Sequence, residues 1–146
     1  MTQNLLSYQL LLPVLIYALY ILFMYFFMFL VRAKSVASGK TSIKYFKTYN
    51  TTEVDPYVLV VGRHLENQYE LPMLFFILNI LTIILNFSSP AFLILAWTFV
   101  GLRLAHSFVH LTSNKVGLRA KIFGLGLLVL IIQTFLILFF SLYVMS

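Results

Sequence analysis

The chain has 146 residues, of which 62% are hydrophobic and 10% charged, whereas soluble proteins carry about 25% charged residues. With 15 Phe and 9 Tyr as well, too little polar surface remains to cover a water-soluble globule. The formal net charge of +6 in so apolar a chain indicates basic loops beside a membrane and not nucleic-acid binding. Cysteine is absent, which excludes disulfides and a protein thiol nucleophile.

Four apolar stretches are long enough, or nearly so, to cross a hydrocarbon core about 30 Å thick. The first has no basic segment before it and is too long for the core of a signal peptide, so we expect a retained helix that Pro13 bends. The second extends back to Pro56, a residue suited to a first helical turn. The predicted spans are residues 5–31, 57–87, 91–112 and 119–145.

Short connections define the expected topology. The turn at residues 86–90 makes the second and third spans antiparallel neighbours, and the other loops cover about residues 33–56 and 113–118. We therefore predict an all-α fold, a single membrane domain over residues 1–146 that forms an up-down four-helix bundle.

The positions of the Lys and Arg residues predict the orientation of the chain. Nine of the ten lie in or beside the two longer loops, and the tenth, Arg103, lies inside the third span. The positive-inside rule then places both loops in the cytosol and both termini outside. We expect a multi-pass protein of the bacterial inner membrane or endoplasmic reticulum type.

Polar residues occupy one face of the second span. Arg63, Asn67 and Glu70 follow the spacing i, i+4, i+7, which places them together on a continuous helix. A charge deep in a bilayer costs from about 3 to more than 10 kcal/mol, so ionisable residues there indicate a functional site.

The third span carries a matching set. Arg103, His106 and His110 follow the spacing i, i+3, i+7 and so share one face. Glu70 and Arg103 lie at similar depths on antiparallel neighbours, which predicts that the two side chains form an ion pair. The spacing of His106 and His110 suits a metal only if further ligands converge, and with three histidines in the chain we predict no metal site.

Together these residues have more hydrogen-bond donors than they can satisfy among themselves. Arg32 and Arg119 add two further cations at the rim. The set is therefore predicted to bind an anionic ligand with several hydrogen-bonding groups, from the cytosolic side. The alternative is that these residues only join the helices to one another.

At this point the sequence resembles a known family, the MAPEG proteins (membrane-associated proteins in eicosanoid and glutathione metabolism). The resemblance covers about residues 5–145, including the four spans and the charged loops. Its motifs are Arg63-x-x-x-Asn67-x-x-Glu70-x-Pro72, Arg103-x-x-His106-x-x-x-His110, Arg119, and Arg32 at the end of the first span.

The resemblance implies a homotrimer that binds glutathione as co-substrate in a cytosol-facing cleft between subunits. It implies that Arg119 stabilises the glutathione thiolate, which attacks a lipophilic electrophile or hydroperoxide from the bilayer. The implied glutathione-binding residues are Arg32, Arg63, Asn67, Glu70, Arg103, His106 and His110.

Several positions depart from the eicosanoid-converting members. His110 stands where those enzymes usually have tyrosine, and Ala120 where the prostaglandin E synthase has serine. Ala33 replaces a second arginine of the leukotriene synthase, and the first loop has no acid before Glu53. Prostaglandin isomerisation is therefore not expected, and the chain is more similar to general bacterial-type members.

Three alternative functions remain. The first is a non-enzymatic lipid-binding or scaffold protein of the same fold, for which an ionisable cleft would be unnecessary. The second is a small multidrug transporter, which would need a glutamate in the first span, whereas residues 5–31 contain no acid. The third is a metal-dependent hydroxylase.

Overall fold

All regular structure in the described part of the chain is helical, as the sequence predicts. The computed structural model describes residues 2–49 and 53–146. Its helices are α1 (Thr2–Ala37), α2 (Tyr45–Thr48), α3 (Pro56–Glu66), the 3-10 turn η1 (Asn67–Tyr69), α4 (Leu71–Ile84), α5 (Pro90–Leu111) and α6 (Val116–Met145).

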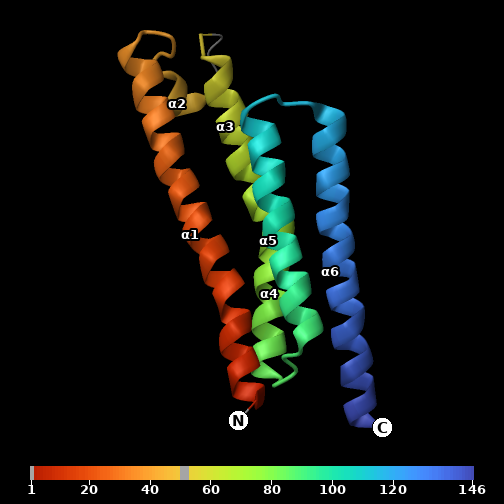
Figure 1. Ribbon diagram of the computed structural model, residues 1–146. Helices are drawn as coiled ribbons and strands as arrows, with labels where there is room; N and C mark the ends of the chain where they lie inside the picture. Colours follow the sequence, from red (N-terminus) through yellow and green to blue (C-terminus); the bar gives the residue numbers. More distant parts are fainter. Residues whose placement is uncertain (1, 50–52) are drawn as a thin grey trace.

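The long helices form rods that alternate in direction (Figure 1). Among the described residues, four segments are long and apolar enough to cross a membrane, and they run over Leu5–Ala37, Pro56–Ile84, Pro90–Leu111 and Val116–Met145. Both termini lie at one end of the bundle, and both longer loops lie at the other (Figure 1). We call this second end the loop end, and the basic residues of both loops therefore gather there.

Helix α1 continues six residues beyond the predicted end of the first span, to Ala37. It stops where Gly39 adopts a left-handed backbone conformation with φ of 72°. The amides of Gly39 and Lys40 donate back to the carbonyls of Val36 and Ser35, each at 3.0 Å, and so satisfy the last turn. The first loop is correspondingly shorter than expected.

The second span is broken, whereas the sequence predicts a continuous helix. Helix α3 begins at Pro56, with the Asp55 side chain accepting from the Tyr57 amide at 2.9 Å. The chain then tightens into η1 and bends at Glu70 (φ −84°, ψ −101°) before α4 starts. Pro72 lies in the first turn of α4, and proline is disfavoured inside a helix, so it explains a boundary here.

Stacked aromatic rings form the middle of the core. The rings of Phe75 and Phe99 stack with centroids 4.6 Å apart, and both are fully buried. Tyr17 of α1 packs edge-on against both, with centroids 5.8 and 6.0 Å away. One cluster thus joins α1, α4 and α5, and Val129 and Leu130 of α6 extend it.

The outer surfaces of the rods are apolar. Phe26 of α1, Ile94 of α5 and Phe135 of α6 are each about 60–67% exposed, in keeping with helices surrounded by lipid or by other apolar helices. The turn between α4 and α5 is short, with Asn86 in the left-handed region at φ of 54°, as its sequence predicts.

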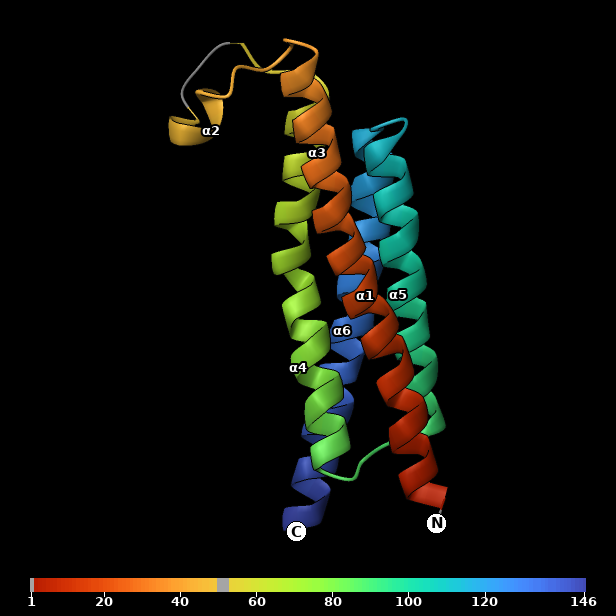
Figure 2. The same cartoon turned by 90° about the vertical axis from the view of Figure 1, so that its left-hand side faces the viewer.

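A hydroxyl pair connects the end of α1 to the start of α3. Ser35 Oγ and Thr41 Oγ1 lie 2.7 Å apart, and both side chains are buried. The Asp55 amide donates to Thr41 Oγ1 at 3.0 Å. We call these three residues the loop-one tie. Helix α2 lies to one side of the bundle (Figure 2).

The aromatic core generates a first prediction. Replacing Phe75 with Ala removes a fully buried ring, so we expect the free energy of unfolding in detergent micelles to fall by about 3–5 kcal/mol. Phe135→Ala removes an outward ring and serves as the matched control, with an expected change of about 0.5 kcal/mol. Equal losses in the two variants would contradict this assignment of the core.

Candidate functional site

Helix α5 presents a buried polar face near the loop end. Arg103, His106 and His110 are buried, in agreement with the face predicted from their spacing, and Ser107, which was not predicted there, is buried with them. Arg103 lies nine residues before Thr112, which corresponds to a depth of about 13 Å along the helix. The site thus extends from the loop end into the membrane-spanning part of the bundle.

The Arg103 guanidinium lies between two aromatic rings. Its Cζ atom is 5.1 Å from the ring centroid of Phe99 in α5 and 5.1 Å from that of Phe123 in α6. Such cation–π contacts stabilise a desolvated cation by about 2 kcal/mol. Its three guanidinium nitrogens have no hydrogen-bond partner among the described residues.

Helix α3 adds His64, which the sequence did not place in the site. The His64 ring is fully buried, 5.2 Å from the ring of His110 and 6.4 Å from that of His106. His106 and His110 are 5.8 Å apart. Within residues 2–49 and 53–146 these rings do not make a metal-binding group of three or more ligands. Both ring nitrogens of His106 and His110 lack hydrogen-bond partners in that part of the chain.

A hydrogen-bonded network supports His64. Tyr17 donates its hydroxyl proton to Gln68 Oε1 at 2.5 Å. Gln68 Nε2 lies 3.2 Å from both the His64 carbonyl oxygen and His64 Nε2, and the Tyr20 hydroxyl is 3.2 Å from the same ring nitrogen. The sequence contains the corresponding spacings, i, i+4 from His64 to Gln68 and i, i+3 from Tyr17 to Tyr20, and these could have indicated the network.

The predicted polar face of the second span is less buried than that of α5. Arg63 and Glu70 are exposed, and Asn67 is half-buried. Arg63 still interacts electrostatically with His110, and Glu70 with Arg103. The close ion pair predicted for Glu70 and Arg103 is reduced to this longer-range attraction, because the Arg103 nitrogens have no hydrogen-bond partner among the described residues. The spacing rule assumes a continuous helix, and the chain leaves that geometry at η1 and Glu70.

Arg119 lies in the first turn of α6, facing the α5 cluster. It shares a recess of about 130 Å³ with His106 and Phe123, at the edge of the bundle. Its Nη1 donates to Asn114 Oδ1 at 2.5 Å, and its buried Nε has no partner in the described chain. The structure therefore places Arg119 beside His106, on the face of α5 that also carries Arg103 and His110.

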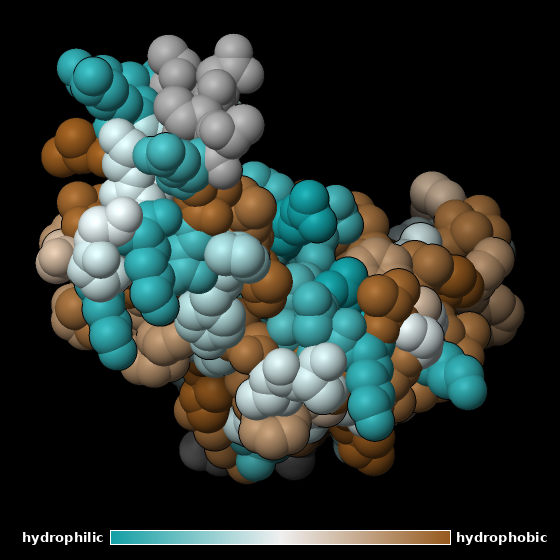
Figure 3. Space-filling model, turned by 90° about the horizontal axis from the view of Figure 1, so that it is seen from above, coloured by the Kyte–Doolittle hydropathy of each residue, from teal (hydrophilic) through white to brown (hydrophobic). Residues whose placement is uncertain are grey.

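Arg32 lies outside this group. Its guanidinium packs over the ring of Phe46, 5.3 Å from the centroid, in a cavity between α1 and the first loop. The sequence predicts that all eight polar residues line a cleft between subunits, and within a single chain Arg32 lies apart from the α5 cluster, so this stays a prediction. Viewed from above, hydrophilic side chains extend across the loop end between apolar surfaces (Figure 3).

The comparisons with known proteins agree with the resemblance of the motifs. The model of the MAPEG family matches residues 10–139, nearly the whole chain, so the protein belongs to the MAPEG family. With its four apolar helices it is an integral, multi-pass membrane protein. No curated protein and no solved structure matches the chain significantly.

The hydrogen bond between Tyr17 and Gln68 is testable by a double-mutant cycle. Tyr17→Phe and Gln68→Leu each remove one partner, and we expect a coupling free energy of about 1 kcal/mol. Pairing Tyr17→Phe with Gln133→Leu is the control, since Gln133 is also buried but makes no hydrogen bond to Tyr17. Unfolding in detergent measures both cycles, and a coupling at Gln68 no larger than at Gln133 would refute the network.

Proposed function

We propose that this protein is a glutathione-dependent transferase or peroxidase that activates the glutathione thiol for attack on a lipophilic substrate. Membership of the MAPEG family supports a glutathione-related activity in general. One observation carries the more specific proposal: the nitrogens of Arg103, His106 and His110 are buried and unpaired within the described chain, beside the recess that holds Arg119.

Such a group of donors fits an anionic ligand. Buried polar groups nearly always find hydrogen-bond partners, and in lipid the cost of leaving them unpaired is several kcal/mol. Glutathione has two carboxylates, peptide groups and a thiol, so it offers acceptors to several donors at once. Guanidinium groups bind carboxylates with two parallel hydrogen bonds, which adds specificity.

The geometry of one subunit supports a site shared between subunits. The recess at Arg119, about 130 Å³ in volume, is large enough for a thiol-bearing side chain but smaller than the 300–1,000 Å³ usual for ligand pockets. Arg63 and Glu70 are exposed, which leaves them accessible to a neighbouring subunit. We therefore propose a homotrimer in which glutathione lies between the inner cluster of one subunit and the outer polar face of the next.

The proposed chemistry needs only glutathione and a second substrate. A guanidinium beside the sulfur stabilises the thiolate, the reactive form of a thiol whose pKa is otherwise about 8.5. The thiolate displaces a leaving group X from an electrophile R–X, forming the C–S bond while X departs with the electron pair. With a hydroperoxide it attacks the terminal oxygen and releases an alcohol after protonation, and a second glutathione then reduces the sulfenic acid to disulfide and water.

Arg119 is the proposed catalytic residue, and its replacement tests the activity. Without the guanidinium the thiol should ionise less, so Arg119→Ala is expected to lower conjugation of chlorodinitrobenzene about 100-fold at pH 7. The pH profile should also move upward toward the unassisted thiol value of about 8.5. Arg119→Lys should retain part of the rate.

The matched control for this prediction is Lys121→Ala, which removes an exposed cation two residues away. It should leave the rate and the pH profile unchanged. Activity of Arg119→Ala equal to that of the wild type would end the proposed role of Arg119. A protein that gains thermal stability from glutathione but conjugates no electrophile would instead be a non-enzymatic binding member.

The shared site is testable by mixing subunits. Subunits with Arg119→Ala and subunits with Asn67→Ala and Glu70→Gln should each be inactive alone. When the two are co-expressed and assemble together, some interfaces combine intact residues from both, and about a quarter of the wild-type activity should return. Failure of mixed assemblies to regain activity would show that each subunit carries its own complete site.

A further inference from the structure

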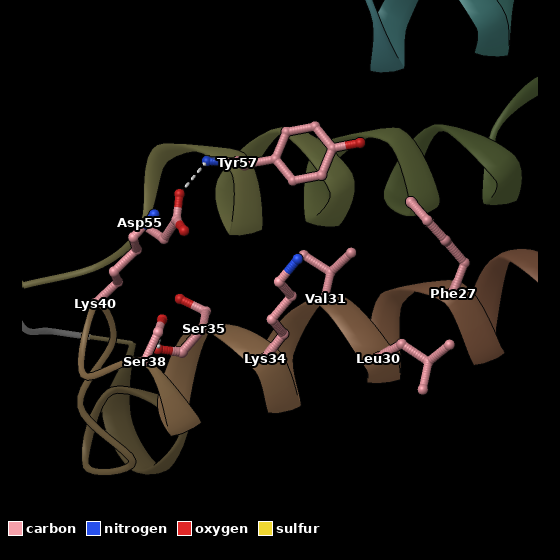
Figure 4. A pocket seen from close by; sticks show the side chains of 9 residues that line it. All are labelled: Phe27, Leu30, Val31, Lys34, Ser35, Ser38, Lys40, Asp55 and Tyr57. Atoms are coloured by element: carbon pink, nitrogen blue, oxygen red, sulfur yellow. Dashed lines mark hydrogen bonds between the residues drawn. The ribbon is translucent and has the colours of Figure 1, made fainter.

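A second cavity, unrelated to the Arg119 recess, lies between α1 and α3 at the loop end. It has a volume of about 550 Å³, within the range of small-molecule sites. Its lining shares no residue with the recess that contains His106 and Arg119. We call it the α1–α3 cavity, and Figure 4 shows the side chains around it.

The floor of the α1–α3 cavity is apolar. Phe27 and Val31 of α1 line it, and Leu30 extends the apolar surface outward, where it is 48% exposed. Phe27 points from α1 toward α3 (Figure 4). An acyl chain is the natural occupant of such a surface in a membrane, because it contacts apolar side chains without leaving polar groups unpaired.

The rim is polar and carries two ammonium groups. Lys34 points from α1 into the space between the helices, and Lys40 lies at the end of the cavity beside Asp55 (Figure 4). Ser38 adds a hydroxyl. The Asp55 carboxylate accepts a hydrogen bond from the Tyr57 amide at 2.9 Å. The lining thus has one negative charge, from Asp55, and two positive charges, from Lys34 and Lys40.

The cavity lies where the apolar part of α1 gives way to the polar loop. Its lining begins at Phe27, inside the apolar part of the helix, and ends at Ser38, one residue beyond the helix. At 1.5 Å per residue this is about 16 Å, enough to cross a headgroup layer of about 6 Å and reach into the hydrocarbon. The loop-one tie fixes both walls, since it connects Ser35 to the start of α3.

From this arrangement we propose that the α1–α3 cavity binds one anionic phospholipid of the leaflet at the loop end. Lys34 and Lys40 bind the phosphate, and an acyl chain lies along Phe27 and Val31. This site goes beyond the proposed thiol chemistry and uses none of its residues. A bound lipid would couple the relative position of α1 and α3 to the composition of the membrane.

The test measures stabilisation of the purified protein in neutral detergent by phosphatidylglycerol and by phosphatidylcholine with the same acyl chains. Phosphatidylglycerol should raise the melting temperature at lower concentrations than phosphatidylcholine. Each lysine near an anionic lipid contributes about fivefold in affinity, so Lys34→Gln with Lys40→Gln should raise the half-maximal phosphatidylglycerol concentration about 25-fold. Both lysines are exposed, so the variant should fold normally.

The matched control is Lys44→Gln with Lys47→Gln, which removes the same charge from the same loop but lies outside the cavity lining. It should change the half-maximal concentration less than about threefold. Equal effects of the two double variants would overturn the site in favour of general attraction to the loop. Equal stabilisation by glycerol phosphate, which lacks acyl chains, would overturn the lipid as occupant, as would the absence of any preference for phosphatidylglycerol.

Discussion

The burial of Arg103 is the constraint on which the loop-end half of the bundle depends. A membrane offers no water to hydrogen-bond such a group, and an unpaired cation there is among the costliest features a helix can carry. Cation–π contacts with two aromatic rings offset part of this cost. Phe99 comes from the same helix as Arg103, whereas the contact with Phe123 requires α6 to pack directly beside α5. The burial of the Arg103 cation and the packing of α5 against α6 therefore depend on each other. The adjoining histidines and Arg119 extend this polar region toward the loops.

Hydropathy and turn residues were sufficient to predict the four rods and their order. An apolar stretch in lipid must satisfy its backbone internally, which leaves few alternatives to a helix. The turn at Asn86 also followed from residue type, because asparagine tolerates the left-handed backbone found there. The ends of the rods were less predictable. Helix α1 runs to Ala37 because Gly39 and Lys40 close its last turn through hydrogen bonds that hydropathy does not encode.

The candidate site likewise has a part that the sequence predicts and a part that it does not. The polar face of α5 was predictable because that helix is uninterrupted, so spacing translates directly into direction. The second span violates that assumption, since η1 and the bend at Glu70 interrupt the helix, and Arg63 and Glu70 are exposed. His64 and Gln68 take the inward positions in their place. Pro72 indicates a helix boundary, but it does not indicate in which direction the chain turns there. That direction depends on packing against α1, through the hydrogen bond from Tyr17 to Gln68.

The loop-one tie also determines where residues can be inserted into the chain with little effect on the helix bundle. Thr41 and Asp55 are fourteen residues apart in sequence but joined by a hydrogen bond, so the segment between them is an excursion whose two ends meet at the tie. Its size has little influence on how the rods meet, because doubling the length of such an excursion costs only about 0.6 kcal/mol in closure entropy. Insertions, epitope tags or a fused reporter are best placed in this excursion, whereas the turn at Asn86 holds α4 and α5 too closely to accept one.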